Sequence, residues 1–351
     1  MTKNKYKEKG VQGIFDVEFR IEQINEKQNI LKKILRAIDF ELFRPLLEEY
    51  LVNHNKKSNV GAKPYDPVLM FKILIIQQIF GLSDDQAEFQ IMDRTSFQQF
   101  LGLTMGDKVP DAKSIWNFRE KITKQNLERK LFDLFRSFLM EKEMIINEGK
   151  MVDASIVSVP RQRNKKDEND KIKSGNGDKL WEDKPNKKRQ KDIDAKWLKK
   201  NGENFYGYKD HTKVDLKTKL IANYEVTDAS VHDSQALDDL LEESDSNQIL
   251  YGDSAYSGEE QTKTIKKYKM VNLTHEKGYK NKPLTQQQKA SNREKSKIRA
   301  RVEHVYGFVS NSMSDFFSRL IGFERNKCVI GLINLIYNMC RYEQISRIGI
   351  H

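Results

Sequence analysis

The hydrophobic positions of the first 150 residues recur at helical spacing, with few signals for strands. The densest apolar segment runs from Val68 to Phe80. Asp66-Pro67 opens this segment, because a proline at the first helical position already has a helical backbone angle, and Gly81 ends it. We therefore predict a helix at this place within an all-helical N-terminal region.

Two further short helices are expected after this segment. Ser83 and Gln86 form a weak capping box at the start of one, and Asp111 is expected to cap the other. Three short helices joined by tight turns suit a helix-turn-helix-like module, whose later helix enters a DNA major groove. A plain helical bundle is the alternative. A long amphipathic helix is expected from Leu127 to Met144.

The pattern changes at Gly149, where short segments rich in β-branched and aromatic residues begin. The residues from Leu216 to Lys219 suit a hairpin connection between two of these segments. Beyond Asp253 the helical pattern returns and continues to Glu343. Strands followed by helices indicate one α/β domain around a mixed sheet. The expected strands are 151–157, 205–215, 220–226 and 248–253.

A long polar segment, 161–203, separates the first two strands. It contains fifteen lysines and arginines, and its aromatic residues include Trp181 and Trp197. A segment of this length inside a compact domain is either functional or disordered. Its charge favours an arm that follows a phosphate backbone, and a disordered insert is the alternative.

Charge and composition add a partner to this picture. The formal net charge is +11 and the isoelectric point is about 9.2, which favours nucleic acid as a partner. No apolar run reaches the roughly 18 residues of a membrane span, and the N-terminus has no signal-peptide core. Cys328 and Cys340 are expected to be buried thiols of a reduced cytoplasm. We expect a cytoplasmic, nucleoid-associated protein with no membrane partner.

Three carboxylates are placed where they could meet. Asp153 lies within a short apolar strand, where an acid is costly unless something positive meets it. Asp253 ends another strand 100 residues after Asp153, and Gly252 allows close backbone approach there. Glu303 lies 50 residues further on, beside the inward stripe of a basic helix, one turn after Arg299. Such carboxylates can hold two Mg²⁺ ions for phosphodiester chemistry.

Five motifs in one order resemble a known family. They are the segment from Tyr65 to Leu103, VPDAKSIWNFREKI, FYGYKDHTKVD with VTDASVHDS, YGDSAY with RARVEH, and RLIGFERNKCVIGLINLIYNMCR. The chain is similar over 65–341 to DDE transposases of bacterial insertion sequences, in the group typified by insertion sequence five (the insertion-sequence four/five superfamily). Each motif alone is modest, and their common order makes the resemblance specific.

The resemblance implies a fold and a site. The fold is α/β: an RNase H-like catalytic domain, with a mixed sheet flanked by helices, preceded by an all-α N-terminal domain. The three metal-binding acids of the family transfer to Asp153, Asp253 and Glu303, and the family's arginine, which grips a terminal phosphate, transfers to Arg299. Asp233 is a rival second acid, which we interpret as the N-cap of a helix. The lysine that many members have seven residues after the glutamate is replaced by Ser310.

These expectations define domains and an activity. Residues 1–145 are expected to bind DNA and dimerise, and residues 146–345 to form the catalytic domain, with a basic insert at about 161–203. The chain would act as a homodimer on the terminal inverted repeats and target DNA, cleaving and transferring strands with two Mg²⁺ ions, or Mn²⁺ in their place. A non-catalytic DNA-binding regulator and an RNase H-like nuclease are the alternatives. The expected DNA contacts besides Arg299 are Lys113, Asn117, Arg119, Lys187, Lys188, Arg189, Lys191 and Trp197.

Overall fold

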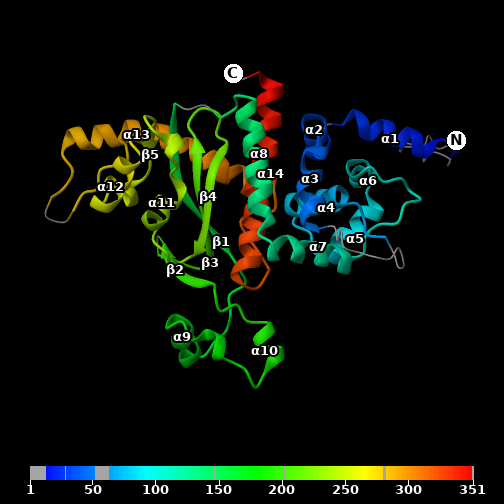
Figure 1. Ribbon diagram of the computed structural model, residues 1–351, viewed down its shortest axis with the longest axis horizontal. Helices are drawn as coiled ribbons and strands as arrows, with labels where there is room; N and C mark the ends of the chain where they lie inside the picture. Colours follow the sequence, from blue (N-terminus) through cyan, green and yellow to red (C-terminus); the bar gives the residue numbers. More distant parts are fainter. Residues whose placement is uncertain are drawn as a thin grey trace, which may run out of the picture.

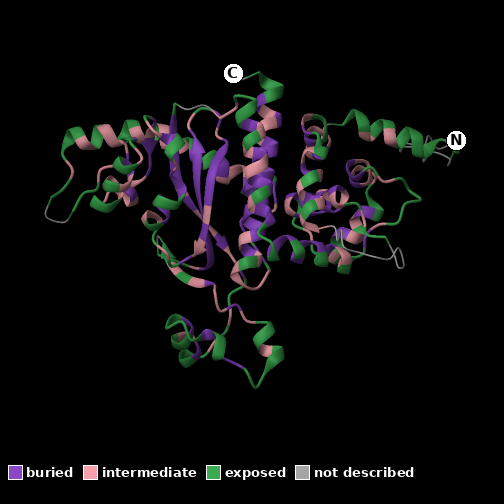
Figure 2. Cartoon of the chain, in the orientation of Figure 1, coloured by how far each residue is buried: buried purple, intermediate pink, exposed green. Residues whose placement is uncertain are grey.

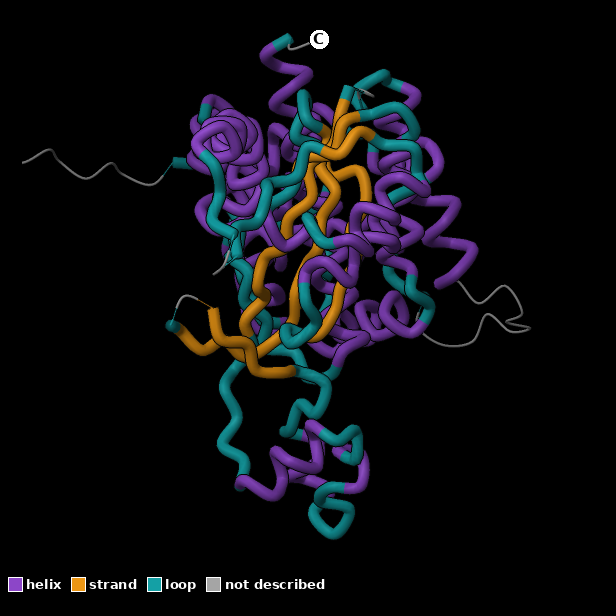
Figure 3. Tube along the Cα trace, turned by 90° about the vertical axis from the view of Figure 1, so that its left-hand side faces the viewer, coloured by secondary structure: helices purple, strands orange, loops and turns teal. Residues whose placement is uncertain are grey.

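A helical N-terminal part lies beside a mixed sheet, and the C-terminal helix α14 (Phe323–Ile348) runs between them (Figure 1). The computed structural model describes residues 13–27, 29–51, 63–145, 148–200, 202–279 and 282–349. A small lobe within the polar insert projects from one end of the sheet, as the view turned by 90° shows (Figure 3). The expected fold class is confirmed: an RNase H-like α/β domain follows an all-helical region.

The helices predicted after Asp66, Ser83 and Asp111 begin at these caps, and the one expected from Leu127 to Met144 ends earlier, at Glu141. Asp66 accepts hydrogen bonds from the amides of Val68 and Leu69, both at 2.9 Å, and Gly81 closes the helix in the left-handed conformation at φ +64°. Ser83 and Gln86 form the expected capping box. The elements are α1 (Asp16–Glu26), α2 (Ile30–Ala37), the 3-10 helix η1 (Phe40–Phe43), α3 (Arg44–Leu51), α4 (Pro67–Phe80), α5 (Asp84–Asp93), α6 (Thr95–Leu101), α7 (Ala112–Lys124) and α8 (Leu127–Glu141).

The sheet has six strands in the described residues, and the long strand β3 joins most of them. β3 pairs antiparallel with β1, β2 and β4, whereas β5 pairs parallel with β1 and β6 parallel with β5. The hairpin connection expected from Leu216 to Lys219 is present and joins β3 to β4. The strands are β1 (Gly149–Ser158), β2 (Lys196–Lys200), β3 (Glu203–Asp215), β4 (Ile221–Asp228), β5 (Ile249–Tyr251) and β6 (Val271–Asn272).

The remaining helices cover the two faces of the sheet. One face packs on α8, α13 and α14, and the other on the apolar side chains of α11, α12 and η5. Figure 2 shows that the strands and α14 form the most buried part of the chain. These elements are α9 (Lys166–Lys173), η2 (Gly177–Lys179), α10 (Pro185–Arg189), η3 (Asp233–Ala236), α11 (Leu237–Leu240), η4 (Glu243–Asp245), η5 (Ser254–Tyr256), α12 (Glu259–Lys267) and α13 (Gln286–Ser312).

Charged pairs tie the helical part to the sheet. Arg136 of α8 makes two hydrogen bonds to Glu242, at 2.8 and 2.6 Å. The same carboxylate accepts from Lys213 of β3, whose fully buried ammonium also donates to Asp245 at 2.6 Å. Each buried cation therefore has an acidic partner, as burial of charge requires.

The polar insert is folded, so the disordered alternative is not what the structure shows. Ile172, Leu180 and Trp181 form a small core of their own, with Ile193 packed against it. The Trp181 indole donates to Glu168 at 2.6 Å. The last part of the insert forms β2, which extends the sheet beside β3.

Two further expectations concern cysteines and membranes. Cys328 and Cys340 are buried free thiols, as predicted. Among the described residues no single helix is long and apolar enough to cross a membrane. α4 and α5 reach that length and composition only as a pair, and they are bent by 101° relative to each other.

Glu128 is an unusual charge in the core where α8, α14 and β4 meet. The residue is 1% exposed, and among the described residues its Oε2 has no hydrogen-bond partner. Gly331 of α14 packs so closely that a Cβ there would meet the Tyr224 hydroxyl at 2.5 Å and the Glu128 Cγ at 2.9 Å. Burial raises the pKa of Glu128 from 4.5 to about 7.

Glu128→Gln should therefore stabilise the fold at high pH. Between pH 4.5 and about 7 the unfolded chain releases a proton that the folded chain keeps, so stability falls as pH rises through this window. Thermal unfolding at pH 5 and pH 8 should show the variant gaining about 1–3 kcal/mol over the wild type at pH 8 and much less at pH 5. An equal difference at both pH values would contradict a buried, raised-pKa carboxyl.

Candidate active site

Asp153 lies in the middle of β1 on the face covered by α13. Its cross-strand partner on β3 is Thr212, whose hydroxyl shares a hydrogen bond of 2.8 Å with Tyr306 of α13. Burial raises the pKa of Asp153 to about 6, and the nearby Asp253 carboxylate adds to the rise, whereas Arg299 lowers it. A carboxylate in this position is a ready partner for a cation.

Asp253 reaches the same region from the neighbouring strand. β5 runs parallel to β1 with Tyr251 opposite Met151, so Asp253 and Asp153 each lie two residues beyond a paired position. The Asp253 carboxylate caps η5 by accepting from the amide of Ala255 at 2.8 Å. Gly252 allows the close packing there, since a Cβ would meet Tyr256 at 3.0 Å.

Glu303 projects from α13 and is connected to Asp153 through an arginine. Arg299 donates to Asp153 Oδ2 at 3.3 Å, and its other terminal nitrogen lies 3.5 Å from Glu303 Oε1. The Glu303 side chain is 64% exposed and also lines an open groove along α13. The guanidinium therefore lies between two of the three predicted acids.

The three acids do not form a closed ligand set in this conformation. In the part of the chain that the structure describes, no group of three or more His, Cys, Asp or Glu side chains could hold a metal ion. Their donor atoms are nonetheless all carboxylate oxygens, which Mg²⁺ and Mn²⁺ prefer. The exposed Glu303 side chain has room to turn, and a cation could replace the Arg299 guanidinium beside Asp153.

Asp233 has a different role from the one expected. The N-cap of η3 is His232, whose side chain accepts from the amide of Ser234, so the N-cap assignment of Asp233 is wrong by one residue. Asp233 instead pairs with the buried Lys209 of β3 at 2.7 Å. Because this ion pair occupies the carboxylate, the structure gives Asp233 a partner other than a metal.

The predicted contacts on α7 separate into two groups. Lys113 and Asn117 are exposed on one side of the helix, together with Trp116, which is 43% exposed. Arg119 is buried and makes two hydrogen bonds of 2.7 Å to Asp84 of α5. The expectation that Arg119 shares a DNA-facing surface with the other two does not match its position, because its guanidinium is committed to α5.

The basic residues of the insert are also divided. Lys187 pairs with Glu168 at 2.7 Å, and the Lys191 ammonium donates to the Arg163 carbonyl and to Asn164. Lys188 and Arg189 are exposed, and the Lys188 ammonium donates to the Asp178 carbonyl at 2.6 Å. Trp197, in β2, is 43% exposed, whereas Trp181 belongs to the core of the lobe. Trp197 is among the expected DNA contacts, and its ring is accessible from solvent.

Sequence analysis missed the tyrosines around the carboxylates. Tyr306 is connected to the Asp153 strand through Thr212. Tyr256 is buried among Asp153, Asp233 and Asp253, whose charges, after burial itself, raise its pKa well above the usual value. A signal for Tyr306 was present, because it lies three residues after Glu303 on the same helix. Ser310, seven residues after Glu303, is exposed.

Comparisons with known proteins match most of the chain. The family model described as the Transposase DDE domain matches residues 148–339, and a model described as a transposase domain matches residues 19–121. The first match covers more than half of the chain. A cryo-EM structure described as a piggyBac transposase synaptic complex with hairpin DNA is similar at a TM-score of 0.45 and 14% identity, over 94% of this chain and 78% of that chain.

The position of Arg119 predicts a structural phenotype. Arg119→Ala should lower the free energy of unfolding by about 3 kcal/mol, because it leaves the mostly buried Asp84 without its counter-ion. Asn117→Ala, on the exposed side of the same helix, should change it by less than about 0.5 kcal/mol. Urea unfolding of both variants checks this, and equal small losses would show that the buried pair contributes little.

Proposed function

Because the chain belongs to the family of transposases with a DDE domain, we propose that it cuts and joins DNA at the ends of a transposable element. Asp153, Asp253 and Glu303 are the proposed catalytic carboxylates. Within the family we place the chain in the insertion-sequence four/five superfamily, in the group typified by insertion sequence five. The terminal inverted repeats and the target site are the DNA partners in this proposal, and the chain acts on them as a homodimer.

The observation that carries the proposal is the pairing of β1 with β5. It places Asp153, within β1, and Asp253, beyond the end of β5 and 100 residues later in sequence, each two residues past a paired position. α13 crosses the same face and brings Arg299 into contact with Asp153. Two acids on adjacent strands and a third on a covering helix are what a carboxylate-based phosphodiester site needs.

The proposed site would hold divalent cations, Mg²⁺ or Mn²⁺, with two ions as the favoured number. When bound, such ions lower the pKa of an attacking water and neutralise charge on the leaving oxygen. Asp153 and Asp253 would provide oxygens from the sheet, and Glu303 would turn in from α13. The raised pKa of Asp153, about 6, reflects the burial of a charge that a cation would balance.

In this proposal Arg299 exchanges its two carboxylate partners for a DNA phosphate. Without DNA its guanidinium balances Asp153 and Glu303. A terminal phosphate is a better bidentate partner for a planar guanidinium than two carboxylates at 3.3 and 3.5 Å. Transfer of Arg299 to the phosphate would free both carboxylates at the moment the DNA arrives.

The reaction proceeds in two displacements at phosphorus. Water first breaks the phosphodiester at the element end and leaves a 3′-OH, and this hydroxyl then attacks a target phosphodiester while the target's own 3′ oxygen leaves. No covalent bond between protein and DNA is needed. We assign end recognition and dimerisation to residues 1–145 and strand chemistry to residues 146–345, with Lys113 and Asn117 as the exposed candidates on α7.

The carboxylate assignment predicts a loss of cleavage without a loss of binding. Asp153→Asn, Asp253→Asn and Glu303→Gln should each slow cleavage of a supercoiled plasmid carrying the element ends by more than about 100-fold. Even outer partners of metal ligands cost about 10–100-fold when removed. Gel-shift binding to the same ends should stay within about threefold.

Glu294→Gln is the matched control, because Glu294 is an exposed acid of the same helix whose partner among the described residues is Lys297, at 2.7 Å. It should cleave normally. Retained cleavage by any of the three variants would remove that residue from the site. End binding by a wild-type chain that never cuts would favour the regulator, and sequence-independent degradation would favour a general nuclease.

The exposed cations of the insert predict a change in salt dependence. Each phosphate neutralised on duplex DNA contributes about 0.9 to the slope of log affinity against log salt. Replacing Lys188 and Arg189 together by alanine should flatten that slope by about 1–2 in titrations of end binding. The double variant Lys113→Ala with Lys121→Ala removes two cations from α7. Its change in slope is compared with that of the insert variant. An unchanged slope for the insert variant would show that the lobe does not contact phosphates.

A further inference from the structure

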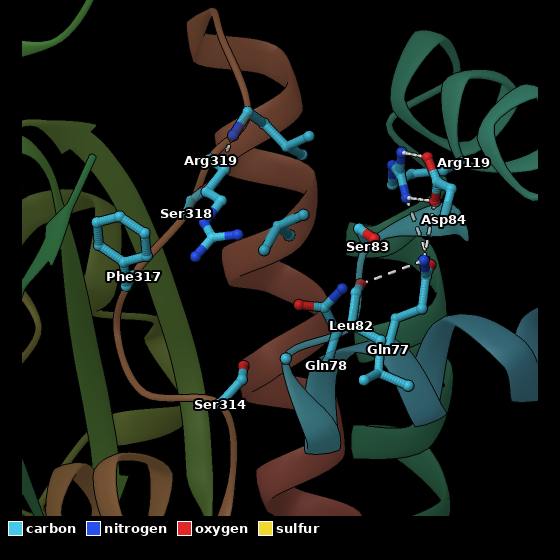
Figure 4. Close-up of a pocket in the computed structure, with 13 residues that line it drawn as sticks. Gln77, Gln78, Leu82, Ser83, Asp84, Arg119, Ser314, Phe317, Ser318 and Arg319 are labelled. Atoms are coloured by element: carbon cyan, nitrogen blue, oxygen red, sulfur yellow. Dashed lines mark hydrogen bonds and ion pairs between the residues drawn. The ribbon is translucent and has the colours of Figure 1, made fainter. Parts of the chain in front are cut away.

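Two neighbouring cavities follow the loop between α13 and α14. The first, about 320 Å³, lies between this loop and the ends of α4 and α7, and Figure 4 shows Phe317 and Arg319 on one side and the Asp84–Arg119 pair on the other. The second, about 300 Å³, lies between the loop and the start of the insert. Arg319 and Leu320 line both cavities, so the two are neighbours along the loop.

The loop holds Phe317 away from the core. Ser158, the last residue of β1, donates to the Phe316 carbonyl at 2.9 Å and accepts from the Ser318 amide at 3.0 Å. This strand-like register buries Phe316 and Ser318, at 7% and 3% exposure, and leaves Phe317 44% exposed. Because side chains alternate along an extended backbone, the ring cannot turn inward without breaking the register.

Among the described residues, Phe317 is one of two exposed aromatic rings that have an arginine guanidinium close to the ring. The Arg319 guanidinium lies 5.9 Å from the centre of the Phe317 ring, and that of Arg161 lies 5.9 Å from the Trp197 ring. The Trp197 ring also packs against the Tyr206 ring, with 5.0 Å between the ring centroids. Arg319 and Arg161 both line the second cavity, so each of the two rings has an arginine that belongs to this cavity.

The surface is positively charged, and its acidic side chains already have hydrogen-bond or ion-pair partners. The second cavity has four cationic side chains and one carboxylate, Asp192, which is 2% exposed. Asp192 accepts from the Tyr208 hydroxyl and from the amides of Gly322, Asp194 and Ala195. In the first cavity the Asp84 carboxylate is held by Arg119. The four cationic residues are Arg161, Arg163, Lys191 and Arg319.

We propose that this surface binds unpaired nucleotides, with one base stacked on Phe317 and another on Trp197, and with phosphates against Arg319 and Arg161. A paired duplex hides the faces of its bases, whereas an exposed aromatic ring needs an open base face to stack on. The proposal rests on the proposed function for the identity of the nucleic acid, the opened DNA next to a cleaved end. The new elements are Phe317, Arg319 and Arg161, which the sequence did not single out.

The test measures binding of single strands without chemistry. The full chain is titrated in EDTA against a fluorescein-labelled oligothymidylate of twelve nucleotides and against a blunt duplex of the same length, by fluorescence anisotropy. Phe317→Ala should weaken oligothymidylate binding by roughly 5- to 100-fold, the range that one stacked base is worth. Its effect on the duplex should stay within about twofold, and Phe317→Trp should restore the binding.

Matched variants separate stacking from charge and from misfolding. Phe19→Ala removes a still more exposed ring on the distant helix α1 and should leave both affinities unchanged. Phe317→Leu keeps an apolar side chain in the loop, and with a melting temperature like the wild type it should still lose oligothymidylate binding. Arg319→Lys keeps the charge but not the planar group, so it should weaken single-strand binding more than duplex binding.

Two results would overturn the inference. Unchanged oligothymidylate affinity in Phe317→Ala would remove the ring from any stacking role, and equal losses on single strand and duplex would reduce the surface to a phosphate contact. Asp153→Asn should bind the oligothymidylate like the wild type, because the assay needs no catalysis. If the wild type cleaves element ends and Phe317→Ala leaves the oligothymidylate affinity unchanged, this inference alone is refuted. If the wild type does not cleave and Phe317→Ala weakens oligothymidylate binding, only the proposed chemistry is refuted.

Discussion

The burial of α14 on nearly all of its sides is the constraint on which the rest of the structure depends. An all-round apolar helix has to be surrounded, and α14 is surrounded by α2, α4, α7 and α8 from the helical part and by β4 and α13 from the other. Gly331 sits at the closest approach. Two of its buried polar side chains have partners in the sheet or next to it: Asn334 donates to Asp210, and Asn338 both donates to and accepts from the backbone of Ile221. The two halves therefore share one core rather than meeting at a removable interface.

The position of the candidate site follows from that shared core. α13 carries Arg299 and Glu303, and it is held against the sheet by Val302, Val305 and Val309. The hydrogen bond between Tyr306 and Thr212 fixes its rotation relative to β3. In the proposed function these acids serve phosphodiester chemistry, which tolerates little displacement of its carboxylates, so helix packing far from the acids would set how well they can meet.

Local signals in the sequence predicted local structure well. The cap at Asp66, the left-handed Gly81, the box at Ser83 and the hairpin after β3 each depend on a few neighbouring residues, so short patterns were sufficient. β6, with two residues, is too short to leave a periodic pattern.

Errors arose where a partner lies far away in the chain. Arg119 was taken for a surface residue because its partner Asp84 is 35 residues distant, and nothing in the spacing reveals the pair. The fold of the insert depends on Trp181 meeting Glu168 and on a core of only a few apolar residues, which composition alone describes as polar. The adjacency of Asp153 and Asp253 could be expected only because strand ends converge in α/β sheets, and which strands would be neighbours came from the resemblance.

The attachment of the insert lobe has a consequence for how such a chain can diverge. The lobe has its own core and meets the rest of the protein at a narrow neck, where Asp192 collects hydrogen bonds from β3 and from the loop before α14. Mutations within the lobe can accumulate, and its length can change, without disturbing the sheet that carries the acids. The neck is the part that must stay constant. The lobe can therefore change during evolution as a separate structural unit, while the sheet beside it is preserved.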